Sequence, residues 1–263
     1  MLDSPRSAAV RRVAALKQRS ERAETGLFLV EGPQAVREAL AADGELVTEV
    51  YCTPEAHERH AALVAAASAA GLVVELASDA ALSAMADTRT PQGILAVARQ
   101  APVRIRSLFE DAALAVILDE VQDPGNAGTV IRAADAAGAA AVALTSGSVD
   151  PYNPKVVRAT TGSLFHLAVA TGAAVTDAAA AARAAGLQVL AADMGGEHLP
   201  ELGEVLARPT AWLFGNEARG LSAEARRAAD RTVAVPIYGA AESLNLGTAA
   251  AVCLYASAFA QRS

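Results

Sequence analysis

The sequence has 263 residues, of which 53% are hydrophobic, 19% charged and 4% aromatic, and its formal net charge is −7 at pH 7. This composition excludes an intrinsically disordered chain and indicates one large or two ordinary globular domains with an aliphatic core. No apolar run reaches the roughly 18 residues of a membrane span, and the N-terminus lacks the apolar segment of a signal peptide. Cys52 and Cys253 are too few for a disulfide framework or a zinc site. We therefore expect a cytoplasmic protein without a bound metal.

A basic segment begins this acidic chain. Residues 1–25 contain six arginines and lysines but three acidic residues, and Arg6, Arg11, Arg12 and Lys17 belong to this segment. Such a segment is suited to follow a phosphate backbone, but it is equally typical of a solvated amphipathic helix. The charge alone leaves both interpretations open.

Apolar runs and helical patterns alternate through the first hundred residues. Gly32-Pro33 ends a strand and begins a helix, and Gly71 ends an alanine-rich helix. We predict helices over residues 8–19, 33–41, 54–70 and 79–86, and strands over residues 28–31, 46–52, 72–76 and 94–98. These elements form a small α/β domain over residues 1–100. An arginine-rich stretch follows, and we assign residues 101–112 to a linker.

From residue 114 strands and helices alternate again, which predicts a second domain with a mostly parallel sheet over residues 113–263. We expect strands at 114–118, 140–144, 167–170, 187–191, 210–214 and 232–236, and helices at 127–137, 154–160, 173–185, 222–229 and 247–261. In the first strand–helix–strand unit, Asn126 is the expected helix N-cap and Gly138 ends the helix. Open α/β sheets bind ligands at the loop that follows such a strand.

Common nucleotide-binding and hydrolase motifs are missing from the sequence. It contains no GxGxxG, GxxxxGK[ST] or GxSxG pattern, which argues against a dinucleotide fingerprint, a P-loop and a nucleophile elbow. His57 and His60 stand three residues apart on a predicted helix, but no cysteine or carboxylate cluster accompanies them. We interpret these two histidines as ordinary surface residues.

Three stretches of the second domain remain as candidates for chemistry. Asn126 and Arg132 lie at the turn and on the helix of the first unit. A glycine-flanked loop after an apolar strand contains Glu217, and a third stretch ends in Ser243 and Asn245 at a helix start. Taken singly, each residue has a structural explanation, as a helix cap, as a surface arginine or as an anchor of its own loop. Spacing alone does not decide between structure and function.

Together the three stretches resemble the three motifs of the SpoU/TrmH family of SPOUT methyltransferases. They match as DPGNAGTVIRAADAAG, FGNEARGLS and VPIYGAAESLN, in the family's order. The N-terminal SPRSAAVRRVAALKQRSERAETGLFLVEGPQAV also resembles the RNA-binding extension of the family, so the resemblance covers nearly the whole chain. After S-L-N the family often continues V-S-V-A, whereas this chain has Leu246-Gly247-Thr248-Ala249. We expect Gly247 to permit close packing in the knot or in a dimer.

The resemblance implies a fold, a cofactor and an assembly. A small α/β/α RNA-binding domain, similar to certain ribosomal proteins, should precede a C-terminal α/β domain with a deep trefoil knot. The family uses S-adenosylmethionine (AdoMet) as methyl donor and is usually a homodimer formed through the knot domain. By motif position, the residues expected to hold AdoMet are Thr145, Gly215, Asn216, Gly220, Val235, Ile237 and Leu244.

The resemblance also implies methyl transfer to a ribose 2′-hydroxyl, the group that distinguishes RNA from DNA. Arg132 is the residue that the family places at this hydroxyl. Because a guanidinium is a poor base, we expect Arg132 to bind the adjacent phosphate and to stabilise the developing alkoxide. The other catalytic candidates are Asn126, Glu217, Ser243 and Asn245. RNA contacts are expected from Arg11, Arg12, Lys17, Lys155 and Arg158.

Ribosomal RNA is the favoured substrate, because the minimal transfer RNA enzymes of the family lack a domain like residues 1–100. A transfer RNA 2′-O-methyltransferase is one alternative. A second is a non-catalytic RNA-binding protein that keeps the fold, although the presence of all five catalytic candidates argues against it. A third is a nucleotide-dependent oxidoreductase, against which the missing glycine fingerprint argues.

Overall fold

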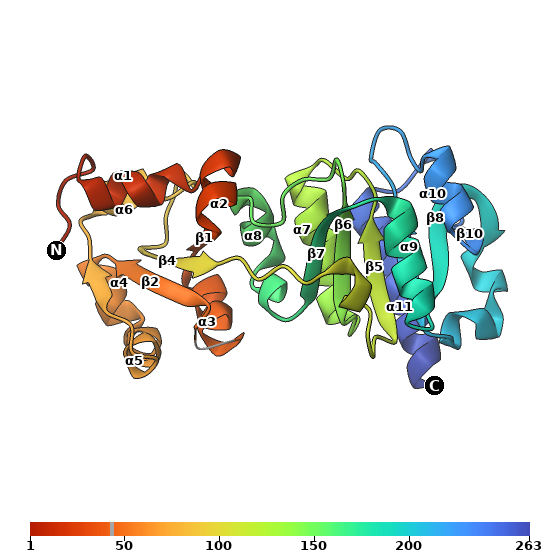
Figure 1. Cartoon of the computed structure of the whole chain (residues 1–263), viewed down its shortest axis with the longest axis horizontal. Helices are drawn as coiled ribbons and strands as arrows, with labels where there is room; N and C mark the ends of the chain where they lie inside the picture. The colour runs from red at the N-terminus through yellow and green to blue at the C-terminus, as the bar shows by residue number, and fades with distance from the viewer. Residues whose placement is uncertain (43–44) are drawn as a thin grey trace. The chain divides into compact units, whose positions relative to one another are not determined.

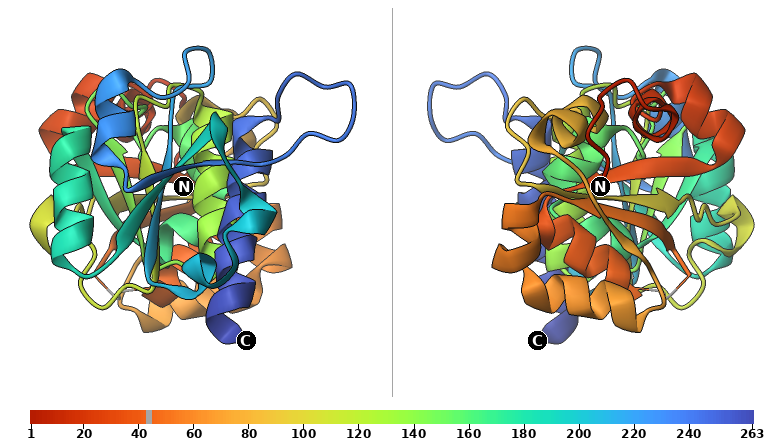
Figure 2. Two further views of the ribbon diagram at one scale, coloured as in Figure 1. Left: turned by 90° about the vertical axis from the view of Figure 1, so that its right-hand side faces the viewer. Right: turned by 90° about the vertical axis from the view of Figure 1, so that its left-hand side faces the viewer.

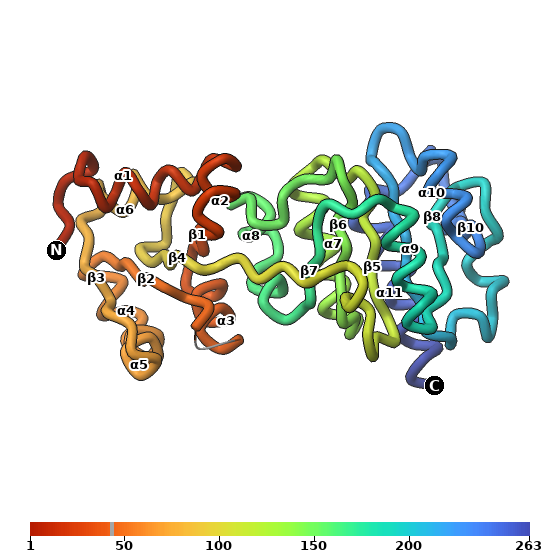
Figure 3. The backbone as a smooth tube through the Cα atoms, in the orientation of Figure 1, coloured from red at the N-terminus to blue at the C-terminus, as the bar shows by residue number. Residues whose placement is uncertain are grey.

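The computed structural model describes residues 1–42 and 45–263, which divide into two compact units. Unit 1 contains Met1–Ala101 and Pro151–Phe165, and unit 2 contains Pro102–Asp150 and His166–Ser263. The backbone therefore passes between the units three times, as the chain trace shows (Figure 3). No helix in the described part of the chain is both long and apolar enough to cross a membrane.

A four-stranded sheet in the order β1-β4-β2-β3 forms the centre of unit 1. Strand β4 is antiparallel to β1 and β2, whereas β2 and β3 are parallel. The strands are β1 (Leu27–Glu31), β2 (Val47–Cys52), β3 (Val74–Leu76) and β4 (Ile94–Arg99). The helices of the N-terminal segment are α1 (Ala8–Ala15), α2 (Arg19–Thr25), α3 (Pro33–Ala42), α4 (Pro54–Arg59), α5 (Ala61–Ala69) and α6 (Asp79–Met85).

One apolar core of unit 1 lies between this sheet and the pair of helices α1 and α6. Val10 and Val13 of α1 pack with Leu82 and Met85 of α6 and with Leu95 of β4, and all five are buried. Burial of each large apolar side chain stabilises the fold by roughly 1.5–3 kcal/mol. The α/β fold expected for the N-terminal part of the chain is confirmed.

The helices predicted over residues 8–19 and 54–70 are both interrupted. α1 ends at Ala15 before α2 begins, and His60 separates α4 from α5. The sequence of α2, RSERAET, has no apolar stripe from which a helix is recognised. The two continuous helices were therefore wrong predictions at these points.

Arg22 attaches α2 to the end of α1. Its side chain is 2% exposed, and its Nη1 donates hydrogen bonds to the carbonyl oxygens of Leu16 and Lys17, each at 2.9 Å. These carbonyls lie just beyond the last turn of α1, where a helix lacks internal donors and favours a cation. In the sequence Arg22 looks like part of a basic surface, but it is buried and caps the end of α1.

Residues 151–165 pack in unit 1, although the sequence analysis placed them in the second domain. They form α8 (Pro154–Thr160) and a short 3-10 helix, η2 (Ser163–Phe165). The ring of Phe28 on β1 lies 4.8 Å from the ring of Tyr152 and 6.2 Å from that of Phe165, measured between centroids. Aromatic side chains on both sides of α8 therefore hold this segment on unit 1.

Unit 2 contains a six-stranded sheet in the order β10-β8-β9-β5-β6-β7, and every strand pair in it is parallel. The strands are β5 (Leu114–Leu118), β6 (Ala141–Thr145), β7 (Ala168–Ala173), β8 (Gln188–His198), β9 (Thr210–Phe214) and β10 (Arg231–Ala234). β6 and β7 extend the sheet on one side of β5, and β9 and β8 extend it on the other. The strand order thus reverses at β5, where such sheets bind ligands.

Helices cover both faces of this sheet (Figures 1 and 2). α7 (Pro124–Ala136) and α11 (Leu246–Arg262) pack together on one face, and α9 (Val175–Ala184) and α10 (Ala223–Ala228) pack together on the other. Short 3-10 helices complete the unit: η1 (Ile105–Ser107), η3 (Leu199–Glu201) and η4 (Gly203–Ala207). The predicted second α/β domain with a parallel sheet is confirmed.

Two close contacts fix α11 on this unit. The Nε1 of the fully buried Trp212 donates a hydrogen bond to Oγ of Ser257 at 3.0 Å, which satisfies both groups in the core. A Cβ atom at Gly247 would lie 2.6 Å from Cγ2 of Thr129 on α7. Gly247 therefore permits close packing within the chain, between α7 and α11.

Candidate functional site

A cavity of about 670 Å³ opens in unit 2 where β9 and β10 end. Apolar side chains form much of its wall, including Phe214, Leu221, Val233 and Ala249. This volume and lining are typical of sites for small molecules and cofactors, which occupy roughly 300–1,000 Å³ and present few polar groups.

Most of the predicted cofactor and catalytic residues meet at this cavity. Ten of the twelve line it, namely Asn126, Gly215, Asn216, Glu217, Gly220, Val235, Ile237, Ser243, Leu244 and Asn245. They come from three loops far apart in the sequence, after β5, β9 and β10. The parallel sheet brings these loops together because it aligns the carboxyl ends of its strands.

A chain of side-chain hydrogen bonds joins the three loops. Glu217 Oε1 accepts from Nδ2 of Asn126 at 3.3 Å, and Asn126 Oδ1 accepts from Nδ2 of Asn245 at 2.9 Å. Glu217 also accepts from the backbone N–H groups of Gln122 and Asp123, at 3.3 and 3.2 Å. Glu217 therefore anchors the loop after β5. The sequence had suggested that Glu217 anchors its own loop instead.

The chemistry of these groups determines how both amides are oriented. A carboxylate only accepts hydrogen bonds, so Asn126 presents its NH₂ group to Glu217 and its oxygen to Asn245. The oxygen of Asn245 accepts from the N–H groups of Gly247 and Thr248, at 2.9 and 3.4 Å, so its NH₂ group faces Asn126. The network uses one N–H of each NH₂ group. Within the described part of the chain no other hydrogen bond of either NH₂ group is found, so the second N–H of each amide is available to a bound molecule.

The start of α7 differs from the prediction. The helix begins at Pro124, and its N-cap is Asp123, whose Oδ1 accepts from the N–H of Asn126 at 2.7 Å. The prediction of Asn126 as N-cap was wrong, because proline prefers the first helical position and the residue before it becomes the cap. The side chain of Asn126 is consequently available to Glu217. Asn245, by contrast, is the N-cap of α11 as well as a member of the network.

The loop after β9 has a rigid internal structure. Asn216 is 9% exposed, its Nδ2 donates to the carbonyl oxygen of Glu120 at 2.8 Å, and its Oδ1 accepts from two N–H groups of its own loop at 3.0 and 3.1 Å. Arg219 forms an ion pair with Glu120 at 2.6 Å. A Cβ atom at Gly215 would lie 2.7 Å from the backbone of Gly220, so only glycine permits this closure. Asn216 thus positions the loop from behind.

The cavity has a charged wall that the sequence analysis missed. Arg226 Nε donates to Oδ2 of Asp193 at 2.7 Å, and both residues line the cavity beside Met194, which is 72% exposed. Burial alone would raise the pKa of Asp193, but the hydrogen bond from the N–H of Gly195 and the ion pair with Arg226 lower it below its usual value. The position of Asp193 in the sequence could have identified it, because it follows the apolar run predicted as a strand at 187–191.

Thr145 lies outside the lining found in the described part of the chain. Its side chain is 4% exposed, its Oγ1 donates to Oδ1 of Asp119 at 2.9 Å, and it accepts from the N–H of Glu120 at 3.1 Å. Burial raises the pKa of Asp119, and the hydrogen bond from Thr145 offsets part of that rise. Thr145 therefore holds the end of β5 in place.

Arg132 and Ser243 occupy different positions relative to the cavity. Arg132 is exposed on α7, and the lining found among the described residues does not include it. It follows Asn126 by six residues, which places the two side chains on different faces of a helix with 3.6 residues per turn. Ser243 does line the cavity, from the loop between β10 and α11, which projects from the rest of unit 2 (Figure 2).

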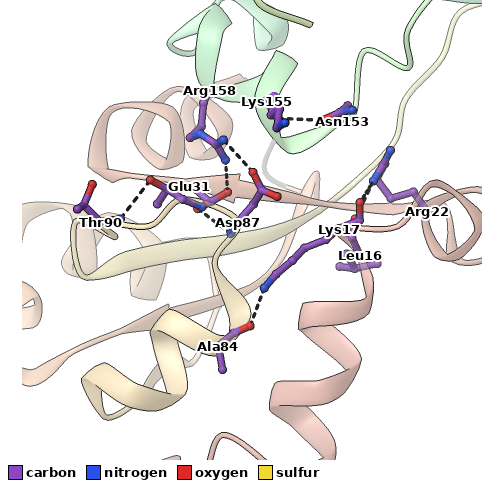
Figure 4. A network of polar contacts seen from close by, with 11 residues as sticks. Leu16, Lys17, Arg22, Glu31, Ala84, Asp87, Thr90, Asn153, Lys155 and Arg158 are labelled. Atoms are coloured by element: carbon purple, nitrogen blue, oxygen red, sulfur yellow. Dashed lines mark hydrogen bonds and ion pairs between the residues drawn. The ribbon is translucent and has the colours of Figure 1, made fainter.

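Two of the three predicted RNA-binding residues near the N-terminus bind other groups of unit 1. Arg12 forms a bidentate pair with Glu49, at 2.7 and 2.8 Å, which lowers the pKa of that carboxyl although burial raises it. Lys17 Nζ donates to the carbonyl oxygen of Ala84 at 2.7 Å (Figure 4). Arg11 is exposed.

Arg158 is held between two carboxylates of unit 1 (Figure 4). Its Nη1 lies 2.8 Å from Oε1 of Glu31, and its Nη2 lies 2.8 Å from Oδ2 of Asp87. The Glu31 side chain is 5% exposed and also accepts from the N–H groups of Asp87 and Thr88, each at 3.2 Å. Lys155, on the same helix as Arg158, is exposed. Arg158 therefore compensates buried charge within unit 1.

Two family models match the chain. Residues 113–255 match the SpoU rRNA Methylase family, and residues 7–96 match the MRM3-like substrate binding domain. The first match alone covers more than half of the sequence.

Named relatives and solved structures extend this similarity over the whole chain. The 23S rRNA (guanosine(2553)-2′-O)-methyltransferase RlmP of Bacillus subtilis is 33% identical over 255 residues, which cover 97% of each chain. An AdoMet-bound rRNA methyltransferase from Sinorhizobium meliloti is 32% identical with a TM-score of 0.85, and covers 97% of this chain and 96% of its own. AviRb from Streptomyces viridochromogenes in complex with AdoMet is 30% identical, has a TM-score of 0.81, and covers 98% of this chain and 99% of its own. The chain therefore belongs to the SpoU family of rRNA methyltransferases.

Proposed function

We propose that this protein transfers the methyl group of AdoMet to a ribose 2′-hydroxyl of ribosomal RNA. The observation that carries the proposal is the hydrogen-bond chain Glu217–Asn126–Asn245, which joins all three family motifs at the edge of one cavity. A relative that is 33% identical over 97% of each chain is named for this reaction on 23S rRNA. The match of residues 7–96 to a substrate binding domain supports a large RNA substrate.

The cavity fits AdoMet in size and in chemistry. Its volume of about 670 Å³ suits a nucleoside-sized molecule, and its apolar wall suits an adenine ring. The loop closed by Gly215 and Gly220 brings backbone groups rather than side chains to the edge of the cavity. AdoMet supplies an electrophilic methyl group on a sulfonium ion.

The polar network orients the substrate ribose. The second N–H groups of the Asn126 and Asn245 amides bind an oxygen of the target nucleotide, and Glu217 keeps both amides in one orientation. Ser243 contributes a hydroxyl from the projecting loop. Because methyl transfer needs an in-line approach of oxygen to carbon, fixed orientation accounts for much of the rate. Arg132 binds the neighbouring phosphate and stabilises the alkoxide as the hydroxyl proton leaves to water or a phosphate oxygen.

The position of Arg132 favours a homodimer formed through α7 and α11. α11 carries an exposed apolar stripe of Val252, Tyr255 and Phe259, which are 40, 37 and 68% exposed, at the spacing of one helix face. The helix packs on α7, which carries Arg132, and Tyr255 donates to the carbonyl oxygen of Ala136 at 3.3 Å. A two-fold interface over this stripe brings the Arg132 of each protomer to the interface and covers the apolar patch. Phe259→Glu should give a monomer in sedimentation, and a dimer that persists contradicts this assembly.

The first experiment is methyl transfer from labelled AdoMet into unmodified ribosomal RNA and, separately, into transfer RNA, followed by nucleoside analysis. We expect a labelled 2′-O-methylnucleoside from ribosomal RNA. Label in transfer RNA alone favours the alternative substrate class. Absence of label in both pools, together with no AdoMet binding in calorimetry, refutes the enzyme and leaves an RNA-binding protein of this fold.

A further inference from the structure

A second, smaller cavity lies in unit 1, whereas the residues proposed for methyl transfer belong to unit 2. Its volume is about 150 Å³. Its lining includes the apolar side chains of Leu82, Ile94 and Leu95, and the loop over residues 87–93 contributes Thr88, Thr90 and Gln92. Glu31 and Arg158 also line it. All of these residues belong to unit 1.

The loop over residues 87–93 is held at both ends, so the cavity is preformed. At its start, the N–H groups of Asp87 and Thr88 donate to Oε2 of Glu31, each at 3.2 Å. At its end, Gly93 has φ of +81°, its carbonyl oxygen accepts from the N–H of Thr53 at 2.8 Å, and a Cβ there would lie 2.7 Å from Cβ of Ala56. A loop fixed in this way loses little freedom when a ligand binds.

The charged side chains at this cavity are paired with one another. Arg158 bridges the carboxylates of Glu31 and Asp87, both at 2.8 Å (Figure 4). An arginine already shared by two carboxylates is poorly placed to bind a phosphate. Within residues 1–42 and 45–263, in contrast, no hydrogen bond of the Gln92 side-chain amide is found, and its Oε1 lies over Gly32 at the rim. The group best placed to bind a ligand is thus neutral and both donates and accepts.

The size of the cavity limits the ligand further. At roughly 30 Å³ for each water molecule, the space corresponds to about five waters. Cofactor sites are usually larger than roughly 300 Å³, so an AdoMet-sized molecule does not fit. A planar ring with polar edges fits both the apolar side chains and the amide at the rim.

From these features we infer that the cavity holds one unpaired base of the RNA substrate. The base packs against the apolar side chains, and its edge binds the amide of Gln92 and the hydroxyls at the rim. Proteins read RNA sequence mainly from such unstacked bases in loops and bulges. This inference rests on the proposed function for its ligand, and it makes residues 87–93 a determinant of which RNA is methylated. The match of residues 7–96 to a substrate binding domain includes the whole loop.

The test measures RNA binding by the full chain without AdoMet, and methyl transfer in separate reactions. The probes are short unmodified transcripts that tile large-subunit ribosomal RNA, and the tightest-bound fragment is then made with a single abasic nucleotide at each unpaired position. The variant is Gln92→Ala, at an exposed side chain. The matched control is Gln34→Ala on α3, because the Gln34 amide is exposed but directed at Glu38 and Arg37.

For the wild-type protein, we expect one abasic position to weaken binding roughly 5-fold or more, as expected when one stacked base is lost. Gln92→Ala should bind the intact fragment several-fold more weakly and should respond much less to the same abasic change, because the two changes remove one interaction. Gln34→Ala should behave as wild type.

Three results overturn the inference: no fragment bound saturably by the wild type, an unchanged affinity of Gln92→Ala, or equal responses of both proteins at every abasic position. Failure of the proposed function is recognised separately. In that case no RNA acquires a 2′-O-methyl group, whereas the coupling between Gln92 and one base is measured by binding alone. Normal methyl transfer with an unaffected Gln92→Ala variant overturns only the inference about this cavity.

Discussion

Substitution of Gly247 by alanine tests how the contact between α7 and α11 positions the site. A Cβ at this position would lie 2.6 Å from Cγ2 and 3.0 Å from Cβ of Thr129. Thr129 cannot move aside easily, since it is β-branched within a helix and its Oγ1 donates to the carbonyl oxygen of Gly125 at 2.8 Å. The backbones of α7 and α11 must therefore separate to admit one methyl group.

The expected loss of stability is the difference between two effects. Overpacking of a close contact costs about 1–3 kcal/mol, whereas alanine in place of glycine inside a helix stabilises by about 1 kcal/mol. The net loss is therefore up to about 2 kcal/mol, which lowers Tm by up to roughly 8 °C in a domain of this size. The same separation lengthens the 2.9 Å hydrogen bond between Asn245 and Asn126, because Asn245 begins the helix that moves. We therefore expect weaker AdoMet binding as well.

Thermal unfolding and calorimetric titration with AdoMet measure the two effects. Thr129→Ser in the Gly247→Ala background removes Cγ2 and keeps the hydroxyl, so it should restore most of the lost stability. Gly239→Ala is the control, because a Cβ there meets nothing within 4 Å. A Gly247→Ala protein whose stability is not raised by Thr129→Ser would refute the reasoning, since the contact with Cγ2 of Thr129 would then cost nothing.

The remaining predictions concern arginines and one carboxylate. Arg132→Lys should lower kcat at least about 100-fold while AdoMet affinity stays unchanged, and an equal loss of both would place Arg132 at the cofactor instead. Arg11→Ala should reduce the salt dependence of RNA binding by about one phosphate contact, whereas Arg12→Ala should mainly lower Tm; comparable slopes for the two variants would contradict this division. The pKa of Glu49 is lowered in the folded state, so its stabilising effect is complete above the usual pKa of 4.5 and is lost as the pH falls below it. Glu49→Gln should therefore be less stable than wild type at pH 7, and acid unfolding should show the difference shrink as the pH falls below 4.5 and vanish below the lowered folded-state pKa.

The central strands of the parallel sheet in unit 2 were predictable because they are apolar almost throughout. The run at residues 114–118 became β5 with the same bounds, and residues 210–214 became β9 likewise. Strands buried on both faces show no alternation of apolar and polar residues. Turn residues on either side nevertheless mark where such strands begin and end. The trefoil knot that the family implies concerns the path of the chain in space. No local pattern records that path, and the knot stays a prediction.

The sequence predicted which residues of the candidate site lie together, but it did not predict the hydrogen bonds between them. The order of the motifs identified Asn126, Glu217 and Asn245, and ten of the twelve predicted cofactor and catalytic residues meet at one cavity. Their partners depend on loop conformation, which a motif does not specify. Pro124 gave an unused signal, because proline at the first helical position makes the preceding residue the cap. The assignment of Asn126 as cap failed at this point.

Charge in the sequence was the least reliable guide, because a cation is informative only when its partner is known. Arg12, Lys17 and Arg158 looked alike as RNA contacts, yet each binds an oxygen of unit 1 at 2.7 or 2.8 Å. The partners of Arg158 stand 127 and 71 residues away in the sequence, at a distance that no local pattern spans. If an arginine bound to buried carboxylates moves to a phosphate, those carboxylates stay buried without a partner. The free-energy cost of that loss exceeds the stabilisation that a surface ion pair contributes. Exposed cations such as Arg11 and Lys155 carry no such cost. RNA affinity should therefore follow exposed cations and unpaired amides such as Gln92, rather than the number of arginines in the segment.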